Sequence, residues 1–218
     1  DRCDPHDLRT ERLPELRHVV VFNPDDANAT SRPAPGFLTW QEVMALGQTV
    51  PENRLTERIS ALELDDPIML EFTSGTTGFP KGCILTHEYW LTIADEVRPY
   101  MGEEDVFLSV TPFYYMDPQW ELISCLAVGA TMVLTRSYSP NVYMELVRKH
   151  QVTVSWATMA PWILKQPPSE LDRRHKLRFL LVGGFPPELH RQFEERFNVI
   201  ARESYGMTEI GPGMTVLP

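Results

Sequence analysis

The chain has 218 residues, of which 20 are basic and 30 acidic, and its formal net charge is −10 at pH 7. This length is enough to bury a core in one or two domains, and an acidic chain without a basic run argues against a nucleic-acid-binding surface. No apolar run is long enough to span a membrane and no signal-peptide pattern is present, which predicts a cytoplasmic location. The three cysteines, Cys3, Cys83 and Cys125, are widely scattered, which favours free thiols over disulfides or a zinc site.

The first 64 residues show little regular patterning and are predicted to be part of an N-terminal subdomain. An apolar, β-branched run at 17–22 is typical of a strand. The segment 23–36 is rich in Asn, Asp, Ser and Pro, which predicts a loop. The segment 38–47 ends at a glycine and predicts a short helix.

Residues 65–218 alternate between apolar strands and amphipathic helices and are predicted to form the core domain. This rhythm is typical of a mostly parallel sheet flanked by helices, so the predicted fold class is α/β. In one predicted helix, Asp117 is expected to be the N-cap and Gly129 to lie just past the end. The predicted strands lie at 67–73 (expected to be buried), 105–110, 131–135, 152–156, 177–184 and 198–206. The predicted helices lie at 87–102, 117–129, 139–150, near Pro161 and at 186–197.

The stretch TSGTTGFPKG, residues 73–82, combines three glycines, four hydroxyl side chains and a lysine. It differs from the Walker loop, because Pro80 stands where that motif needs glycine and Lys81 is followed by Gly82 rather than by a hydroxyl residue. Its glycine spacing also fails the dinucleotide fingerprint. Glycines and hydroxyls after a strand still suit an anion, because the backbone can approach it and amides and hydroxyls donate to it. A flexible linker is the alternative, and the predicted strand and helix on either side argue against it.

Four segments in the same order resemble the motifs of the adenylate-forming (AMP-binding) superfamily, which includes acyl-CoA synthetases, peptide-synthetase adenylation domains and firefly luciferase. The first is LEFTSGTTGFPKGCILTH, and SYGMTE at 204–209 resembles the family's Y-G-x-T-E. Between them, VTPFYYMDPQW and LVGGFPPEL take the places of the P-x-F-H segment and of a Gly-Gly-x-Pro turn. The resemblance covers residues 66–218, and YMDPQ is most similar to crotonobetaine/carnitine-type and other CoA ligases.

The resemblance implies that this chain binds ATP and Mg²⁺. Thr208 would contact the α-phosphate and Glu209 would ligate Mg²⁺, and together with Lys81 they are the predicted catalytic residues. Magnesium prefers hard oxygen ligands and few protein carboxylates, so one glutamate is suitable. The residues implied to hold the β- and γ-phosphates are Thr73, Ser74, Gly75, Thr76, Thr77, Gly78 and Lys81. Those implied to hold adenine are Tyr205, Gly206 and the backbone of Gly184, Phe185 and Pro186.

The same resemblance implies an acid pocket at Tyr115, Gly183 and Gly184. Tyr115 stands where most acyl-CoA synthetases have a histidine, so an aromatic face is kept but titration near neutral pH is lost. Asp117 has two interpretations, a helix cap or the aspartate with which peptide-synthetase domains hold an amino group, and the following Pro118 favours the cap. The tryptophans predicted to lie mainly in the core, with one or two also lining the pocket, are Trp120, Trp156 and Trp162.

As a whole, the resemblance implies an acid–thiol ligase, which makes an acyl-adenylate from ATP and then passes the acyl group to coenzyme A, as in fatty acid metabolism. Two alternatives stay open: an adenylation domain that loads an amino or aryl acid onto a carrier protein, and a non-catalytic nucleotide-binding descendant. The chain starts without methionine and ends soon after SYGMTE. We therefore expect a fragment of the large N-terminal domain, without the family's C-terminal lid domain and inactive on its own. The identity of the acid and homo-oligomerisation are left open.

Overall fold

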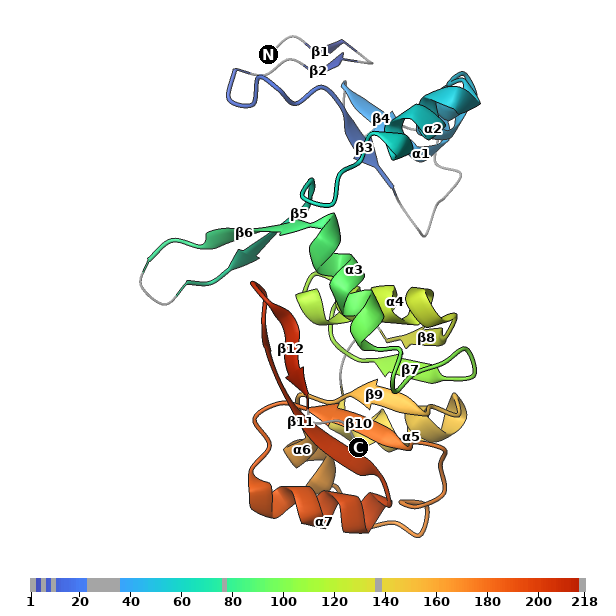
Figure 1. Cartoon of the computed structure of the whole chain (residues 1–218), viewed down its shortest axis with the longest axis vertical. Helices are drawn as coiled ribbons and strands as arrows, with labels where there is room; N and C mark the ends of the chain where they lie inside the picture. The colour runs from blue at the N-terminus through green and yellow to red at the C-terminus, as the bar shows by residue number, and fades with distance from the viewer. Residues whose placement is uncertain are drawn as a thin grey trace. The chain divides into compact units, whose positions relative to one another are not determined.

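The computed structural model describes residues 3–4, 7–8, 11–22, 36–75, 78–135 and 139–215. It divides into two units, residues 1–62 and 63–218, and each unit is described on its own (Figure 1). None of the helices in the described ranges has the length and apolar character that crossing a membrane requires.

The first unit is built from short elements. The strand predicted at 17–22 is confirmed as β3, which pairs in parallel with β4. The predicted helix is confirmed as α1, and its start is a capping box in which Thr39 and Glu42 bond each other's backbone amides. The predicted loop 23–36 lies, except for its last residue, outside the described residues. The elements are β1 (Cys3–Asp4), β2 (Asp7–Leu8), β3 (Val19–Val21), β4 (Phe37–Thr39), α1 (Trp40–Gly47) and α2 (Glu52–Ser60), of which β1, β2, β4 and α2 were not predicted.

The second unit contains a six-stranded sheet in the order β12-β11-β10-β9-β7-β8. All neighbouring pairs are parallel except β11 and β12, which confirms the predicted mostly parallel α/β fold. Its strands are β7 (Val106–Ser109), β8 (Thr131–Leu134), β9 (Val154–Trp156), β10 (Phe179–Val182), β11 (Ile200–Met207) and β12 (Gly211–Thr215). Its helices are α3 (His87–Glu96), α4 (Met116–Val128), α5 (Pro140–Lys149), α6 (Ala160–Leu164) and α7 (Pro187–Phe197).

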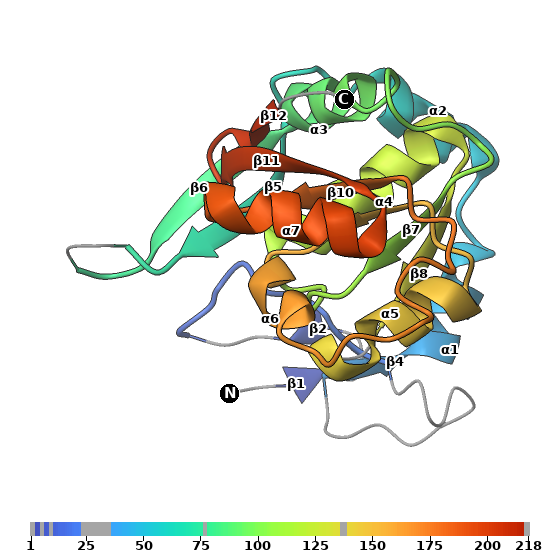
Figure 2. The same cartoon turned by 90° about the horizontal axis from the view of Figure 1, so that it is seen from below.

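Helices cover both faces of this sheet (Figure 2). Successive side chains of a strand point to opposite faces, and β10 shows the result. Phe179 and Leu181 join a core with residues of α3 and α4, whereas Leu180 and Val182 join a second core with residues of α5, α6 and α7. Because both faces are covered, all four residues of β10 are buried.

The strand predicted at 67–73 exists, but its predicted burial is wrong. It is β5 (Pro67–Thr73), and it pairs antiparallel with β6 (Lys81–Thr86), which was not predicted. The two form a hairpin of their own, and the side chains of β5 alternate between half-buried and exposed. The connection between them is too short for a crossover to a parallel strand, which needs a dozen or more residues, so a hairpin results.

The start of α4 also differs from the prediction. The N-cap position is taken by Tyr115, and Asp117 is the second residue of the helix. No side chain of the described residues caps this end. Pro118 is tolerated inside the first turn because the first amides of a helix have no intrahelical partner. The predicted end is confirmed, since Gly129 has the left-handed conformation, with φ of 78°.

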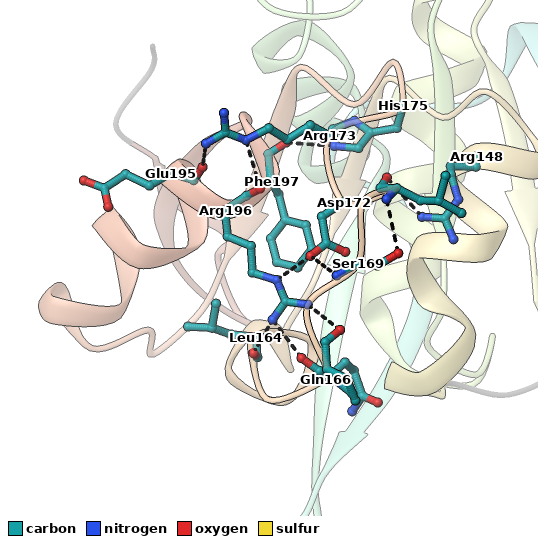
Figure 3. A network of polar contacts seen from close by, with 12 residues as sticks. Arg148, Leu164, Gln166, Ser169, Asp172, Arg173, His175, Glu195, Arg196 and Phe197 are labelled. Carbon is teal, nitrogen blue, oxygen red and sulfur yellow. Dashed lines mark hydrogen bonds and ion pairs between the residues drawn. The ribbon is translucent and has the colours of Figure 1, made fainter.

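A buried ion pair joins α7 to the segment that follows α6 (Figure 3). Arg196 Nε lies 2.8 Å from Asp172 Oδ2, and both side chains are largely buried. The Ser169 amide donates a further hydrogen bond to the same carboxylate oxygen. The other guanidinium nitrogens donate to three backbone carbonyls, those of Leu164, Gln166 and Pro167. The Arg196 side chain thereby neutralises the buried Asp172 carboxylate and donates to three backbone carbonyl oxygens that would otherwise lack a partner among the described residues.

Candidate functional site

A cavity of about 500 Å³ lies at the carboxyl edge of the sheet. The chain passes from β7 to β8 on one side and then returns to the other side of β7 for β9. Ligands of open α/β sheets bind at such a switch point, outside the carboxyl ends of the strands. The lining residues come from the β7–α4 loop, α4, β9, the β10–α7 turn and the β11–β12 hairpin: Tyr115, Met116, Asp117, Trp120, Trp156, Gly183, Gly184, Glu203, Ser204, Tyr205, Gly206, Met207, Thr208, Gly211 and Pro212.

The turn after β10 forms one wall of this cavity. Gly184 has φ of +63°, which favours glycine. At Gly183, a Cβ atom would stand 3.4 Å from Cη2 of Trp156, so the absence of a side chain lets the turn lie against the indole. The Glu203 carboxylate on the neighbouring strand accepts hydrogen bonds from the amides of Gly184 and Phe185. It also lies 3.4 Å from Nε2 of His190 on α7.

The β11–β12 hairpin forms another wall. Its two strands come so close that a Cβ atom on Gly206 would stand 2.4 Å from the carbonyl oxygen of Gly211. Gly211, with φ of +72°, in turn packs against α3, because a Cβ atom there would stand 2.9 Å from Ile93 Cδ1. Larger residues at these two glycines would separate the strands or push the hairpin away from α3.

A hydrogen bond from α3 fixes the turn that carries Thr208. The Tyr89 hydroxyl donates to the Thr208 carbonyl oxygen at 3.1 Å and lies 3.0 Å from Met116 Sδ at the start of α4. Burial first, and then the nearby Cys83, Glu209 and Glu71, raise the pKa of Tyr89 to about 12, so its hydroxyl keeps its proton at neutral pH. Tyr89 therefore connects two walls of the cavity.

We expect Tyr89→Phe to lower the free energy of unfolding by about 1 kcal/mol, the usual contribution of one hydrogen bond. Backbone amides at 207–211 should also exchange hydrogen faster, because the turn loses its contact with α3. Urea denaturation and hydrogen-exchange mass spectrometry measure the two effects. Tyr100→Phe removes a hydroxyl near the same core and is the control, with unchanged exchange at the turn. Equal exchange at 207–211 in wild type and Tyr89→Phe would contradict the expectation.

The predicted site residues separate into two groups. Six of them line the cavity together: Tyr115, Gly183, Gly184, Tyr205, Gly206 and Thr208. Phe185 is buried against His190 and Phe193, so only its backbone is left for a ligand. Pro186 stands at the N-cap position of α7. Neither is among the residues that line the cavity in the described part of the chain.

The phosphate-loop residues lie on the β5–β6 hairpin and, where described, do not line the cavity. Thr73 and Lys81 form the strand pair next to the connecting loop, and Thr76 and Thr77 lie outside the described residues. Gly75 has φ of +62°, and its absent Cβ atom would stand 3.1 Å from the Phe79 carbonyl oxygen, so the loop folds back on itself. Ser74 precedes this turn, and Gly78 has no heavy atom within 4 Å of where a Cβ would stand.

Glu209 is exposed and lies close to Cys83 of the β5–β6 hairpin. Partial burial and then the Glu209 carboxylate raise the pKa of the Cys83 thiol on β6. The SYGMTE segment therefore lies close to strand β6 of the hairpin that carries the phosphate loop. No group of three or more Cys, His, Asp or Glu side chains that could hold a metal ion occurs among the described residues.

Several lining residues were not predicted as site residues. Glu203 is the clearest, and the signal for it is an acidic residue inside a predicted strand, directly before SYG. Trp120 and Trp156 were predicted to lie mainly in the core, with one or two of the tryptophans also lining the pocket, and both do line the cavity. Trp162 is 51% exposed, so its predicted core position is wrong. It lies on α6, whose buried residues are Ala160 and Ile163, so it points away from that face. Cys83 and Cys125 are free thiols, as predicted.

The sheet is open and mostly parallel, and a cavity with glycines in its wall lies at its switch point. These features define an α/β protein of the doubly wound class, whose members bind ligands at that point. Comparison with known proteins is more specific. Residues 6–218 match the model of the family described as AMP-binding enzyme, and the chain belongs to that family.

Two curated relatives show which members of the family this chain resembles in sequence. Crotonobetaine/carnitine–CoA ligase of Proteus mirabilis is 36% identical over 160 residues, which cover 70% of this chain and 31% of the relative. The putative acyl-CoA synthetase YngI of Bacillus subtilis is 28% identical over 219 residues, which cover 97% of this chain and 39% of the relative. The chain thus spans about a third of the length of these relatives.

Solved structures agree with this placement. O-succinylbenzoate coenzyme A synthetase (MenE) of Bacillus subtilis, in complex with ATP and magnesium ion, is 27% identical with a TM-score of 0.61, and the match covers 71% of this chain and 33% of that chain. The N-terminal domain of FACL13 from Mycobacterium tuberculosis has a TM-score of 0.66 at 19% identity, covering 86% and 49%. The second likeness concerns the fold, which is that of the N-terminal domain of adenylate-forming enzymes.

Proposed function

We propose that this chain is the nucleotide-binding part of an ATP- and Mg²⁺-dependent acid–thiol ligase, which activates a carboxylic acid as an acyl-adenylate and transfers it to coenzyme A. The observation that carries the proposal is the cavity at the switch point. It gathers Tyr115, the Gly183–Gly184 turn and the Tyr205–Thr208 segment, which are far apart in the sequence. Membership in the AMP-binding enzyme family and the acyl-CoA ligase relatives support the assignment.

In the first half-reaction, a carboxylate oxygen of the acid attacks the α-phosphorus of ATP. A new bond between that oxygen and phosphorus forms, and the bond from the α-phosphorus to the bridging oxygen breaks, which releases pyrophosphate. In the second, the thiolate of coenzyme A attacks the acyl carbon and AMP leaves. The reacting carboxylate is its own nucleophile, so no covalent enzyme intermediate is needed. The protein's task is to position charged groups and donate hydrogen bonds to them.

The residues of the chain are assigned as follows in this proposal. Thr208 donates to the α-phosphate, and its position is fixed through the Tyr89 hydrogen bond to its carbonyl oxygen. Tyr205 offers an aromatic face to adenine, while Lys81 and the loop before it hold the outer phosphates. Glu209 is the protein ligand of Mg²⁺, which would neutralise charge on the phosphates when bound. Its exposed carboxylate and the lack of a competing acidic cluster among the described residues fit that role.

The proposal is tested by acid-dependent ATP–pyrophosphate exchange with the intact protein and a panel of fatty, aryl, betaine-like and amino acids. Loss of free coenzyme A thiol is then followed with the best acid. Exchange followed by thiol loss would support the ligase. Exchange without thiol loss would favour carrier-protein loading instead. If no acid supports exchange although Mg–ATP binds, the chain is a nucleotide-binding protein without this chemistry.

We expect the 218-residue chain by itself to give no steady formation of acyl-adenylate. It spans about a third of the curated relatives, so most residues that these relatives could bring to the reaction lie outside it. Radioactive or mass-spectrometric detection of acyl-adenylate measures this, with the intact protein as the positive control. Robust turnover by the 218-residue chain would contradict the expectation.

A further inference from the structure

A second cavity, of about 540 Å³, lies at the other edge of the same sheet. Its lining comes from the connection that precedes β10 (residues 173–178), from the end of α7 and from the start of β11. Because β10 and β11 pair in parallel and in register, these residues gather at the amino ends of the two strands. We call it the amino-edge cavity. Its described lining shares no residue with that of the switch-point cavity.

The lining of the amino-edge cavity is strongly positive. It contains four cations, Arg173, Lys176, Arg178 and Arg202, and one anion, Glu194, which leaves a net charge of +3 in a chain whose net charge is −10. The switch-point cavity, by contrast, has no lysine, arginine or histidine in its described lining. Like charges that line one cavity repel each other, and a bound anion relieves this repulsion.

Two of these arginines are held in place by ion pairs. Arg178 Nη2 lies 2.6 Å from Asp105 Oδ2, and Arg202 Nη1 lies 2.9 Å from Glu194 Oε1. A guanidinium has five N–H donors. Within the described residues, the hydrogen bonds of Arg178 start from Nε and Nη2 and those of Arg202 from Nη1. Each arginine is therefore positioned by the protein and keeps a nitrogen with which it can donate to a ligand.

The connection that carries the other two cations is also anchored. The Arg173 guanidinium and the His175 ring both bond backbone carbonyl oxygens at the end of α7 (Figure 3). Since His175 Nδ1 accepts from the Leu177 amide, Nε2 is the donor. Burial lowers the pKa of His175, so the ring adds no charge at neutral pH. Lys176 follows this anchor, is exposed, and forms no ion pair with the described residues.

The composition of the lining also indicates which anion fits. Its volume lies in the range of small-molecule sites, about 300–1,000 Å³. Its described part contains no phenylalanine, tyrosine or tryptophan, so a nucleobase would find no aromatic face on which to stack. Asn198 is exposed at the C-cap of α7 and offers an amide that can bond hydroxyl groups. Guanidinium groups bind phosphate through paired N–H donors.

We propose that the amino-edge cavity is a second ligand site, which binds a phosphorylated sugar or polyol through Lys176, Arg178 and Arg202. The site lies apart from the cavity assigned to the ligase reaction and does not depend on that assignment. Its ligand is a free phosphorylated metabolite or the phosphorylated polyol headgroup of a lipid, because both present the same chemistry to these cations.

Calorimetric titration of the intact protein with glucose 1,6-bisphosphate, without ATP or Mg²⁺, tests the proposal. Lys176→Glu should weaken binding on the order of tenfold or more, because it replaces an attraction by a repulsion. Lys149→Glu changes the net charge equally at an exposed position of α5 outside both cavities, and it should bind as the wild type does. No binding by the wild type at low millimolar ligand would overturn the proposal, and so would equal weakening in the two variants.

Hydrogen-exchange mass spectrometry locates the ligand. Glucose 1,6-bisphosphate should slow exchange at residues 173–178 and 198–202 and leave residues 113–117 beside the switch-point cavity unchanged. Protection of 113–117 in place of 173–178 would overturn the proposal. ADP carries the same number of phosphates and a base, and it should protect 173–178 less well. Stronger protection of that segment by ADP would contradict the sugar or polyol assignment.

Sedimentation with vesicles distinguishes the two sources of the ligand. The vesicles consist of phosphatidylcholine with or without phosphatidylinositol 4-phosphate. Sedimentation that needs the phosphorylated lipid and is lost in Lys176→Glu would support a headgroup as the ligand. Binding of glucose 1,6-bisphosphate without such sedimentation would support a soluble metabolite. Sedimentation that Lys176→Glu leaves unchanged would contradict a role of this cavity in lipid binding.

Discussion

The Glu209→Gln variant of the intact protein should lose ATP–pyrophosphate exchange on the order of 10²-fold or more at low millimolar Mg²⁺. Glutamine keeps the size of the side chain but removes the negative charge that a divalent cation needs. Charge neutralisation on a polyphosphate leaving group is worth several kcal/mol in a transition state, and each 1.4 kcal/mol is a factor of ten. Because Glu209 is exposed, the substitution should leave the free energy of unfolding within about 0.5 kcal/mol of the wild type.

The same variant tests independently whether the Glu209 carboxylate lies beside Cys83, as the structure places it. The Glu209 carboxylate contributes to the raised pKa of the Cys83 thiol. Removing that charge should lower the pKa of Cys83 and speed its alkylation by iodoacetamide at pH 8, which mass spectrometry of the Cys83 peptide measures. Glu170→Gln, at another exposed position, is the matched control for both readouts. Full exchange activity in Glu209→Gln, with Mg²⁺ titrated to saturation, would contradict the metal-ligand role.

We expect Arg196→Met to destabilise the protein by about 3 kcal/mol or more, because it leaves the Asp172 carboxylate without its ion-pair partner and three backbone carbonyls without the guanidinium donor (Figure 3). Methionine keeps much of the length and apolar surface of the side chain, so the loss reports mainly the polar contacts. Urea denaturation measures it. Arg98→Met breaks an exposed ion pair with Asp95 and should cost less than about 1 kcal/mol.

The same network predicts a dependence on pH. Burial alone would raise the pKa of Asp172, but hydrogen bonds from Arg196 and the Ser169 amide hold it below its usual value. A carboxyl with a lowered folded-state pKa adds stability above its unfolded-state pKa, and this contribution is lost as the pH falls toward the folded-state value. The destabilisation by Arg196→Met should therefore be full near pH 7 and shrink below about pH 4. A difference that stays constant between pH 7 and pH 3 would show that Asp172 is not the group involved.

The sequence by itself determined the fold class and most of the regular elements. The reason is physical, since side chains that repeat every second or every third to fourth residue can bury one face only in a strand or a helix. Gly129 could be predicted as the end of α4 because few residues other than glycine adopt a left-handed conformation. The family resemblance gave the nucleotide motifs, and the match over residues 6–218 agrees with it.

Only the tertiary structure decided the pairing of the elements and the composition of the cavity. The apolar run of β5 is compatible with a buried parallel strand, and its partner β6 makes it one half of an exposed hairpin. Asp117 next to Pro118 looked like a cap, but the N-cap position is taken by Tyr115, two residues earlier. Tyr89 and Thr208 are 119 residues apart, and Glu203 meets the Gly184 turn only because β10 and β11 pair in register. Such contacts depend on how distant segments pack, and no local pattern of residues encodes that.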